Sequence, residues 1–436
     1  MSEKKVLFIT YYWPPSGGAG VQRSLKFVKY LPEFGWEPTV LTVNPLSATY
    51  PVEDPSLEKD VPVTIPVVRT TSWEPLKFLA FFSGKSAVPY GGFTNRDKEK
   101  WTQKLLRFLR GNLLIPDARV GWVRPAVRAA EKLIREHSIG TVVISSPPHS
   151  SQLIGLRLKR VFPDLVWVAD LRDPWTDIYY YKDMLHLPFA RKKDASLEKA
   201  VLKSCSAVIV VSDPIRRSFM GKLDDPSSVR FEVLPNGFDR SDFPGEVVPP
   251  SEVFRVTYVG TIAESYRPEV FFRAFSSFVR EHPEGRIRLR LVGSTSWLMR
   301  VLEEEGLLSC LEQTGHVSHQ QAVSFMRDSS ALLLVIPDTP GAEGILTGKL
   351  FEYLGAGIPV IGIGPASGRA AAIVNGCGAG RFFERSEERG VRTYLEELYA
   401  SWHKNPDLRH HGDVSAFERK SQASVLSGLL DDLRAK

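Results

Sequence analysis

Short apolar runs alternate with helical periodicity through the first half of the chain. The runs hold four or five mostly apolar residues, the length of a buried strand. They fall at residues 6–10, 39–43, 141–144, 166–169 and 207–211. Apolar positions with helical spacing follow at residues 21–31, 151–161 and 192–202. Strands that alternate with helices predict a parallel sheet with both faces covered.

The same pattern restarts in the second half, with strand-like runs at residues 255–259, 286–292, 331–336 and 359–363. Residues 234–250 between the halves are rich in Pro and acidic side chains, which is typical of a linker. We therefore predict an α/β protein with two Rossmann-like, doubly wound domains that face each other across a cleft. The predicted domains cover residues 1–240 and 241–408, and residues 409–436 are expected to form a helix at the domain junction.

Composition narrows the class of protein. The 436 residues are 43% apolar and 24% charged, as expected of a globular chain. Lys and Arg exceed Asp and Glu by 56 − 50 = 6, which suggests an anionic partner such as phosphate or a lipid surface. A nucleic-acid binder would carry a denser basic stripe, so we expect no nucleic-acid partner. Three scattered cysteines without a CxxC pair predict neither a disulfide framework nor a cysteine zinc site, and favour a reducing compartment.

Apolar segments near residue 100 raise the question of a membrane. The longest apolar runs, at residues 76–82 and 331–337, are far shorter than the ~20 residues that span a bilayer. Residues 96–110 are amphipathic if helical, with a row of cations beside a row of apolar side chains. We predict a cytoplasmic protein with a peripheral contact to the inner face of the membrane through residues 76–110. An ordinary surface helix packed on the core is the alternative.

A glycine-rich loop follows the first predicted strand. Gly17, Gly18 and Gly20 allow close approach of the backbone, and the helix N-terminus behind them attracts an anion. Arg23 stands where a dinucleotide fingerprint has its third glycine, and the second strand does not end in an acid, so NAD and FAD are disfavoured. The loop predicts an anion or sugar site, with a tight turn as the alternative.

Two further loops of the first half end strands at the same edge of the sheet, where ligands of open α/β sheets bind. His149 follows one strand and can bond to a sugar hydroxyl or a phosphate; packing or helix capping is an equal alternative. Asp170, Arg172 and Asp173 follow the next strand, where unpaired charges would be costly. Together with His149 they are candidate catalytic residues, and a salt bridge of Arg172 with a carboxylate is the alternative for the charged loop.

The second half carries a candidate phosphate site. Gly260 and Thr261 end its first strand, Gly293 ends the next, and Arg267 opens the following helical region. Backbone N–H groups of a later glycine-rich turn can cradle a phosphate, and Glu352 beyond it can bind ribose hydroxyls. The turn contains Gly344, Ile345, Leu346 and Thr347. The chain has no Asp-x-Asp pair, so we expect Arg, Lys and helix N-termini to meet the diphosphate charge without a metal.

These motifs, in this order, resemble the GT-B glycosyltransferases of family four, a group of retaining enzymes that use nucleotide-activated sugars. The resemblance covers almost the whole chain and is most specific at residues 348–354, Gly-Lys-Leu-Phe-Glu-Tyr-Leu. It implies a donor site in the C-terminal domain, with Glu352 on the ribose, and an acceptor site in the N-terminal domain. It implies no cofactor and no protein nucleophile, because the leaving diphosphate is thought to help deprotonate the acceptor.

The chain departs from the family pattern at two places. The resemblance implies an Arg and a Lys after the Gly260-Thr261 turn, but only Arg267 is present there, so Lys349 is expected to share the role. The first of two glutamates spaced by eight residues would fall at Gly344, and the nearest acid is Glu343. Either Glu343 or backbone groups would then hold the sugar.

Three functions follow as hypotheses. The first is a hexosyl-type transferase that moves a sugar from a nucleotide-sugar to a cell-surface glycan or a lipid-linked acceptor, as in polysaccharide biosynthesis. The second is a nucleotide-sugar epimerase of the same architecture. The third is a non-catalytic, sugar-binding GT-B subunit.

Overall fold

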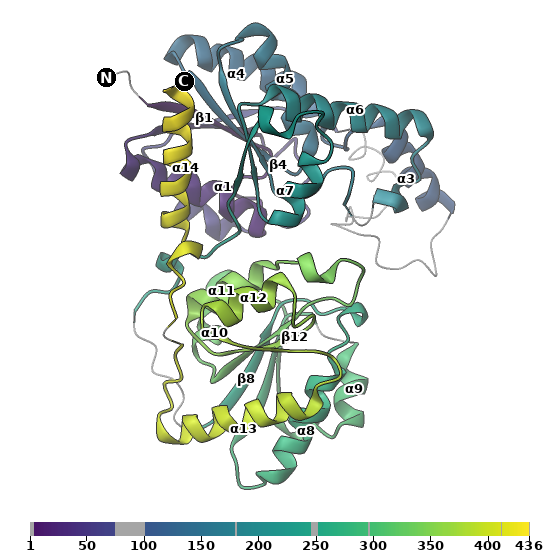
Figure 1. Cartoon of the computed structure of the whole chain (residues 1–436), viewed down its shortest axis with the longest axis vertical. Coiled ribbons are helices and arrows are strands. Elements are labelled where there is room, and N and C mark those ends of the chain that lie inside the picture. The colour runs from purple at the N-terminus through teal and green to yellow at the C-terminus, as the bar shows by residue number, and fades with distance from the viewer. Residues whose placement is uncertain are drawn as a thin grey trace. The chain divides into compact units, whose positions relative to one another are not determined.

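The computed structural model describes residues 4–74, 101–178, 181–245, 252–294, 297–410 and 412–435. The predicted membrane segment therefore lies largely outside the described residues, since 75–100 are not among them. The chain forms two compact units (Figure 1), Met1–Pro235 with Arg419–Lys436, and Asn236–Glu418. Each unit has one parallel sheet between helices, which confirms the predicted α/β, two-domain architecture.

The sheet of the first unit has seven strands in the order β3-β2-β1-β4-β5-β6-β7. The strands are β1 (Lys5–Thr10), β2 (Glu37–Val43), β3 (Val67–Thr70), β4 (Thr141–Ser146), β5 (Val166–Leu171), β6 (Ala207–Val210) and β7 (Arg230–Val233). All neighbouring strands are parallel. The order reverses at β1, so β1 and β4 form the switch point at which doubly wound sheets bind ligands.

Helices cover both faces of this sheet because each buried strand is apolar on both sides. The helices are α1 (Ala19–Tyr30), α3 (Trp101–Leu113), α4 (Val123–His137), α5 (Gln152–Val161), α6 (Pro188–Ser204), α7 (Asp213–Met220) and α14 (Arg419–Arg434). Leu7 and Ile9 of β1 pack in the core beneath α4 and α5, and Val6 and Phe8 pack beneath α1 and α14. The last helix, α14, therefore belongs to the first unit.

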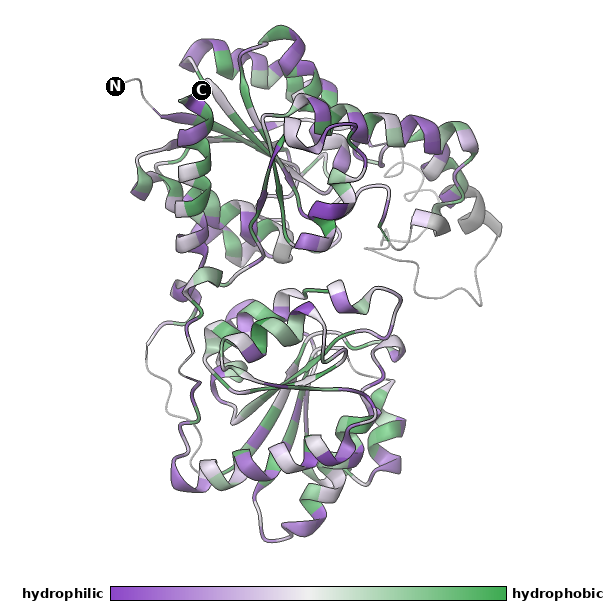
Figure 2. Ribbon diagram, viewed as in Figure 1, coloured by the Kyte–Doolittle hydropathy of each residue, from purple (hydrophilic) through white to green (hydrophobic). Residues whose placement is uncertain are grey.

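The sheet of the second unit has six strands in the order β10-β9-β8-β11-β12-β13. The strands are β8 (Phe254–Val259), β9 (Ile287–Val292), β10 (Leu311–Thr314), β11 (Ala331–Val335), β12 (Val360–Ile363) and β13 (Gly380–Phe383). The helices are α8 (Glu269–Glu281), α9 (Leu298–Glu304), α10 (His319–Arg327), α11 (Gly348–Ala356), α12 (Arg369–Gly376) and α13 (Glu388–Lys404). Figure 2 shows the hydrophobic residues concentrated along the central strands and the inner sides of the helices.

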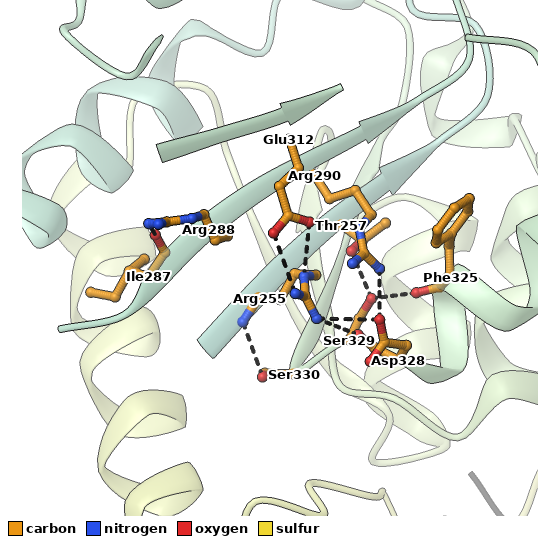
Figure 3. Close-up of polar contacts among 10 residues, drawn as sticks. All are labelled: Arg255, Thr257, Ile287, Arg288, Arg290, Glu312, Phe325, Asp328, Ser329 and Ser330. Carbon is orange, nitrogen blue, oxygen red and sulfur yellow. Dashed lines mark hydrogen bonds and ion pairs between the residues drawn. The ribbon is translucent and has the colours of Figure 1, made fainter. Parts of the chain in front are cut away.

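One face of the second sheet carries an ionic network between β8, β9 and β10 (Figure 3). Nε of Arg255 and Nε of Arg290 lie 3.0 and 2.9 Å from one oxygen of Glu312. Their Nη1 atoms lie 3.2 and 3.0 Å from Oδ2 of Asp328, just beyond α10. The Arg290 guanidinium also lies over the Phe325 ring, 4.8 Å from its centroid. Two cations and two carboxylates thus balance one another and tie the edge strand β10 to the sheet.

Candidate functional sites in the two units

The loops at the carboxyl ends of β1, β4 and β5 enclose a cavity of about 330 Å³ in the first unit. Five residues predicted from the sequence line it: Gly17, Gly20, His149, Arg172 and Asp173. Gly18 and Asp170 are not among the lining residues. Gly18 is the N-cap of α1 with φ +95°, a conformation that favours glycine. The switch point of the sheet has therefore brought most of the predicted residues of this half together.

His149 opens the short helix His149–Ser151 after β4, and its ring stacks on Trp175 with centroids 4.8 Å apart and planes 12° apart. Its Nδ1 atom is buried and has no hydrogen-bond partner among the described residues. Burial lowers the pKa of His149 to about 4; the charges of Arg172 and Lys222 act in the same direction, and only Asp117 opposes them. His149 is therefore neutral at pH 7 and presents one ring nitrogen for a hydrogen bond.

Asp117 fixes the turn that carries His149. Its Oδ2 accepts a hydrogen bond from the Ser150 backbone N–H at 2.8 Å, and its Oδ1 accepts from the Ser150 hydroxyl at 2.7 Å. The Arg119 N–H donates to the same Oδ1 at 2.8 Å. Asp117 also lines the cavity. Sequence reasoning missed it, because an acid after a proline is typical of any turn and Ser150 lies far along the chain.

Arg172 lies against Gly20. Its Nε and Nη2 donate to the carbonyl oxygens of Ser146 and Pro147, at 3.1 and 3.2 Å. A β-carbon on Gly20 would lie 2.2 Å from Nη1 of Arg172. The glycine is needed to admit the guanidinium, a reason that the sequence did not reveal.

Asp170 lies beneath the cavity. Arg23 and Asp170 form a buried ion pair, with Nη2 of Arg23 3.0 Å from Oδ1 and side-chain exposures of 0% and 1%. Ser145 donates to the other carboxylate oxygen at 2.9 Å, and Nη1 of Arg23 donates to the Pro235 carbonyl at 2.9 Å. The salt-bridge partner is thus Arg23, which the sequence singled out only as a missing glycine. Asp170 supports the loop, and a catalytic role for it stays a prediction.

Two other carboxylates line the cavity. Asp173 accepts no hydrogen bond from any residue that the structure describes, and burial raises its pKa although Arg172 lies near. Asp194 accepts from the Trp175 indole and from the Tyr181 hydroxyl, both at 2.8 Å. Burial raises the pKa of Asp194 to about 6. Sequence reasoning missed Asp194 because it lies inside a charged helix, α6.

In the second unit, Lys349 at the start of α11 reaches back over the end of β8. Its Nζ donates to the Tyr258 hydroxyl and, at 3.3 Å, to the Thr261 carbonyl. Gly260 has φ +115°, and a β-carbon there would lie 2.5 Å from Cε of Lys349. Burial lowers the pKa of Lys349 to about 8, and the charge of Glu352 partly opposes this shift. The ammonium is therefore still mostly protonated at pH 7.

Other predicted residues gather at the same edge. Gly293 ends β9 with φ +115°, and a β-carbon there would lie 2.6 Å from the Gly260 carbonyl oxygen, so the two turns are closely packed. Thr347 is the N-cap of α11, and its hydroxyl oxygen is buried without a hydrogen-bond partner among the described residues. The Thr347 hydroxyl, two residues before Lys349 in the chain, is therefore a polar group whose hydrogen bonds are not satisfied within the described residues.

Glu352 lies one turn further along α11 with 26% of its side chain exposed. His319 stands between two carboxylates: its Nδ1 is 3.8 Å from Glu352, and its Nε2 is 3.7 Å from Asp242. Sequence reasoning missed this row, because the three residues come from separate segments of the unit.

The remaining predicted residues differ in exposure. Glu343 and Gly344 lie in the short helix Ala342–Gly344, where Glu343 is exposed. Ile345 and Leu346 are partly buried against the core. Arg267 is exposed and has φ +47°.

Arg385 was not predicted from the sequence. It follows β13 and donates to the carbonyl oxygens of Tyr266 and Ile336 at 3.3 and 2.6 Å. It places a second cation close to the Arg267 segment.

Several solved structures share this fold, and some of them are glycosyltransferases. Sucrose-phosphate synthase from Thermosynechococcus elongatus is 14% identical, with 99% of both chains covered and a TM-score of 0.59. Anabaena HepE, solved in complex with UDP-glucose, is 14% identical over 98% of this chain and 99% of that one, with a TM-score of 0.58. WaaG, a glycosyltransferase involved in lipopolysaccharide biosynthesis, is 15% identical over 98% and 99%, with a TM-score of 0.54.

At these identities the likeness shows the fold, and the chain has the GT-B architecture that the sequence predicted. No protein-family model matches the chain, and no curated protein matches its sequence. Within the described residues, no group of three or more His, Cys, Asp or Glu side chains is arranged to hold a metal ion. No helix in the same part of the chain is long and apolar enough to cross a membrane.

Proposed function

We propose that the protein is a glycosyltransferase that binds a nucleotide-sugar in its second unit and an acceptor in its first. The observation that carries the proposal is the position of Lys349, whose ammonium is held beside the N-terminus of α11 and over the bare backbone of Gly260. A helix N-terminus and an adjacent cation together favour an anion of high charge density, such as a diphosphate. The fold shared with HepE in complex with UDP-glucose supports the same reading.

The roles of the other residues follow from their positions. Glu352, a turn beyond Lys349, would accept hydrogen bonds from the ribose hydroxyls. The Thr347 hydroxyl and the backbone of residues 344–347 would bind the diphosphate, with Arg267 at its rim. Glu343 or the backbone at Gly344 would hold the sugar. Gly260, Thr261 and Gly293 would form the floor, where a side chain on either glycine would displace Lys349 or the neighbouring turn.

The cavity of the first unit would receive the acceptor. Neutral His149 and the carboxylate of Asp173 can bond to hydroxyl groups, and Arg172 supplies a fixed positive charge. The proposal also includes retention of anomeric configuration, independence from metals and cofactors, and a glycan or lipid-linked acceptor. It further includes a cytoplasmic location at the inner face of the membrane, with a contact through residues 76–110.

A panel of nucleotide-sugars tests the proposal by thermal shift, because a ligand of the native state raises the melting temperature. Mass spectrometry of the stabilising donor, with and without acceptor glycans, then identifies the reaction. Glu352→Gln and Lys349→Met should abolish stabilisation and turnover, whereas Lys404→Met, at an exposed position at the end of α13, should not. An epimerised donor without acceptor would contradict transfer, and binding without any turnover would indicate a non-catalytic subunit.

A further inference from the structure

Large apolar side chains are exposed on two neighbouring segments of the first unit. Leu113, the last residue of α3, is 69% exposed, and Leu185, Leu187 and Phe189, which precede and begin α6, are 43%, 40% and 56% exposed. The Asn112 side chain joins the two segments: its amide donates to the Leu185 carbonyl at 3.0 Å and accepts from the Leu187 N–H at 2.7 Å. These four apolar residues form what we call the α3–α6 patch.

The exposure of the patch is imposed by the backbone. Leu185 has φ +54°, in the left-handed region that residues with a β-carbon disfavour. Asn112, which is only 4% exposed, holds the chain on either side of it. Met184 and His186 line the cavity, while Leu185 and Leu187, which alternate with them, are exposed. Met184 and His186 of this segment therefore face the cavity, whereas Leu185 and Leu187 are exposed on its other side.

Cations adjoin the apolar side chains. Lys192 and Lys193 stand three and four residues after Phe189 in α6, so they lie on the same face of the helix. Both are exposed, as is Arg191. Residues 188–193 contain no acid, and Asp194, which follows, is buried and accepts from Trp175 and Tyr181. Apolar side chains beside exposed cations match the chemistry of an anionic lipid surface, where a tail region adjoins a layer of phosphates.

We propose that the α3–α6 patch docks on the surface of an anionic lipid bilayer. Leu113, Leu185, Leu187 and Phe189 enter the interface, and Lys192 and Lys193 contact lipid phosphates. The site differs from the contact predicted for residues 76–110. If the cavity of the first unit receives the acceptor, as proposed above, the wall formed by Met184 and His186 would bring a lipid-linked acceptor in the bilayer next to the cavity.

Co-sedimentation of the full chain with vesicles tests the proposal. We expect binding to vesicles of phosphatidylcholine and phosphatidylglycerol in equal parts, weaker binding to phosphatidylcholine alone, and a decline with salt. Leu187→Ser with Phe189→Ser, and Lys192→Ala with Lys193→Ala, should each lower the partition coefficient by about tenfold.

Two double variants are matched controls. Leu46→Ser with Val63→Ser changes two apolar residues that are 88% and 101% exposed elsewhere in the first unit. Lys199→Ala with Lys203→Ala removes two lysines from the same helix, α6, where both pair with Asp224. Both controls should keep the wild-type partition coefficient.

Absence of vesicle binding, or equal binding to both vesicle types in all variants, would overturn the proposal. A concentration-dependent dimer that Phe189→Ser abolishes would overturn it too, because the patch would then be covered by a second copy of the chain. Thermal shift with nucleotide-sugars separates this test from that of the proposed function. The patch variants should still be stabilised by the donor. If the wild-type chain binds vesicles but no nucleotide-sugar stabilises it, only the proposed function is refuted.

Discussion

The guanidinium of Arg172 occupies the space where a side chain at Gly20 would begin, since a β-carbon there would lie 2.2 Å from Nη1. The second unit repeats this relationship, because a β-carbon on Gly260 would lie 2.5 Å from Cε of Lys349. In both units a glycine following the first strand admits a cation from a distant segment. The glycines that resemble a phosphate-binding loop thus also position the positive charges.

Gly20→Ala should displace Arg172 and reduce turnover by at least about tenfold, which corresponds to about 1.4 kcal/mol of transition-state stabilisation. The clash is with the end of a flexible side chain, so we expect stability to fall by less than about 1 kcal/mol. Steady-state kinetics and urea unfolding measure the two effects. Gly140→Ala is the matched control, because a β-carbon there meets nothing within 4 Å. Equal activities of the two variants would show that Arg172 is not required.

Donor binding should depend on the protonation of Lys349. Its pKa is lowered to about 8 in the free protein, so the ammonium is present below that pH and is lost as pH rises through it. We expect donor affinity to be constant below about pH 7 and to fall above about pH 8. In Lys349→Arg the decline should disappear from this range, because a guanidinium stays charged. Titration calorimetry from about pH 6.5 to about pH 9.5, roughly 1.5 units either side of the transition, measures this. An identical decline in the Arg variant would exclude Lys349 as its source.

The ionic network of the second unit should make stability depend on pH. Burial raises the pKa of Glu312, but hydrogen bonds and charges from Arg255 and Arg290 outweigh that effect and leave the pKa below its ordinary value. A carboxyl with a lower pKa in the folded state stabilises the fold above its unfolded pKa of about 4.3, and that stabilisation is lost as pH falls through the folded value. Urea unfolding should show a smaller loss below pH ~4 in Glu312→Gln than in the wild type. Glu284→Gln, at an exposed position of the same unit, should leave the wild-type loss unchanged.

Removal of one cation from this network should destabilise the second unit. Arg290→Met leaves Glu312 and Asp328 with Arg255 alone, and both carboxylates are about one third exposed. We expect a loss of about 2 kcal/mol, less than for a fully buried pair because water screens the carboxylates. Urea unfolding of the variant would measure the loss, and an unchanged unfolding midpoint would show that the network contributes no net stability.

Asp117→Ala should impair turnover without unfolding the protein. The variant frees the Ser150 N–H and hydroxyl, so the turn that holds His149 on Trp175 loses its anchor. We expect turnover to fall by about tenfold or more, with a loss of stability of about 1–2 kcal/mol. Asp225→Ala is the control, because Asp225 accepts the same pair of hydrogen bonds from Ser227 at an exposed turn. Full activity in Asp117→Ala would show that His149 needs no anchor.

The sequence predicted the central strands of both sheets, and it missed all four edge strands. β3, β7, β10 and β13 are four residues long and carry charged or polar side chains such as Arg69, Glu232, Glu312 and Arg381. Central strands are buried on both sides and read as apolar runs, whereas an edge strand faces solvent and lacks that pattern. The pattern therefore indicated the fold without the full width of either sheet.

The candidate site was predictable where its residues follow strands at one sheet edge. Gly17, Gly20, His149, Arg172 and Asp173 come from three such loops, so the topology alone brings them together. Asp117 and Asp194 come from a turn and a helix outside those loops, and only three-dimensional packing places them at the cavity. The pairing of Arg23 with Asp170 was unpredictable for the same reason, since nothing local joins residues so far apart in the sequence.

The place of α14 has a consequence for the order in which the chain folds during synthesis. Leu426, Leu429 and Leu430 of α14 share a core with Leu25 and Val28 of α1, so they complete a layer begun some four hundred residues earlier in the chain. A ribosome would release the whole second unit, Asn236–Glu418, before α14 emerges. Until then the apolar side of α1 has no cover from α14. The unit whose synthesis begins first is therefore the last to be completed, and a chain that stops before residue 419 would expose that surface permanently.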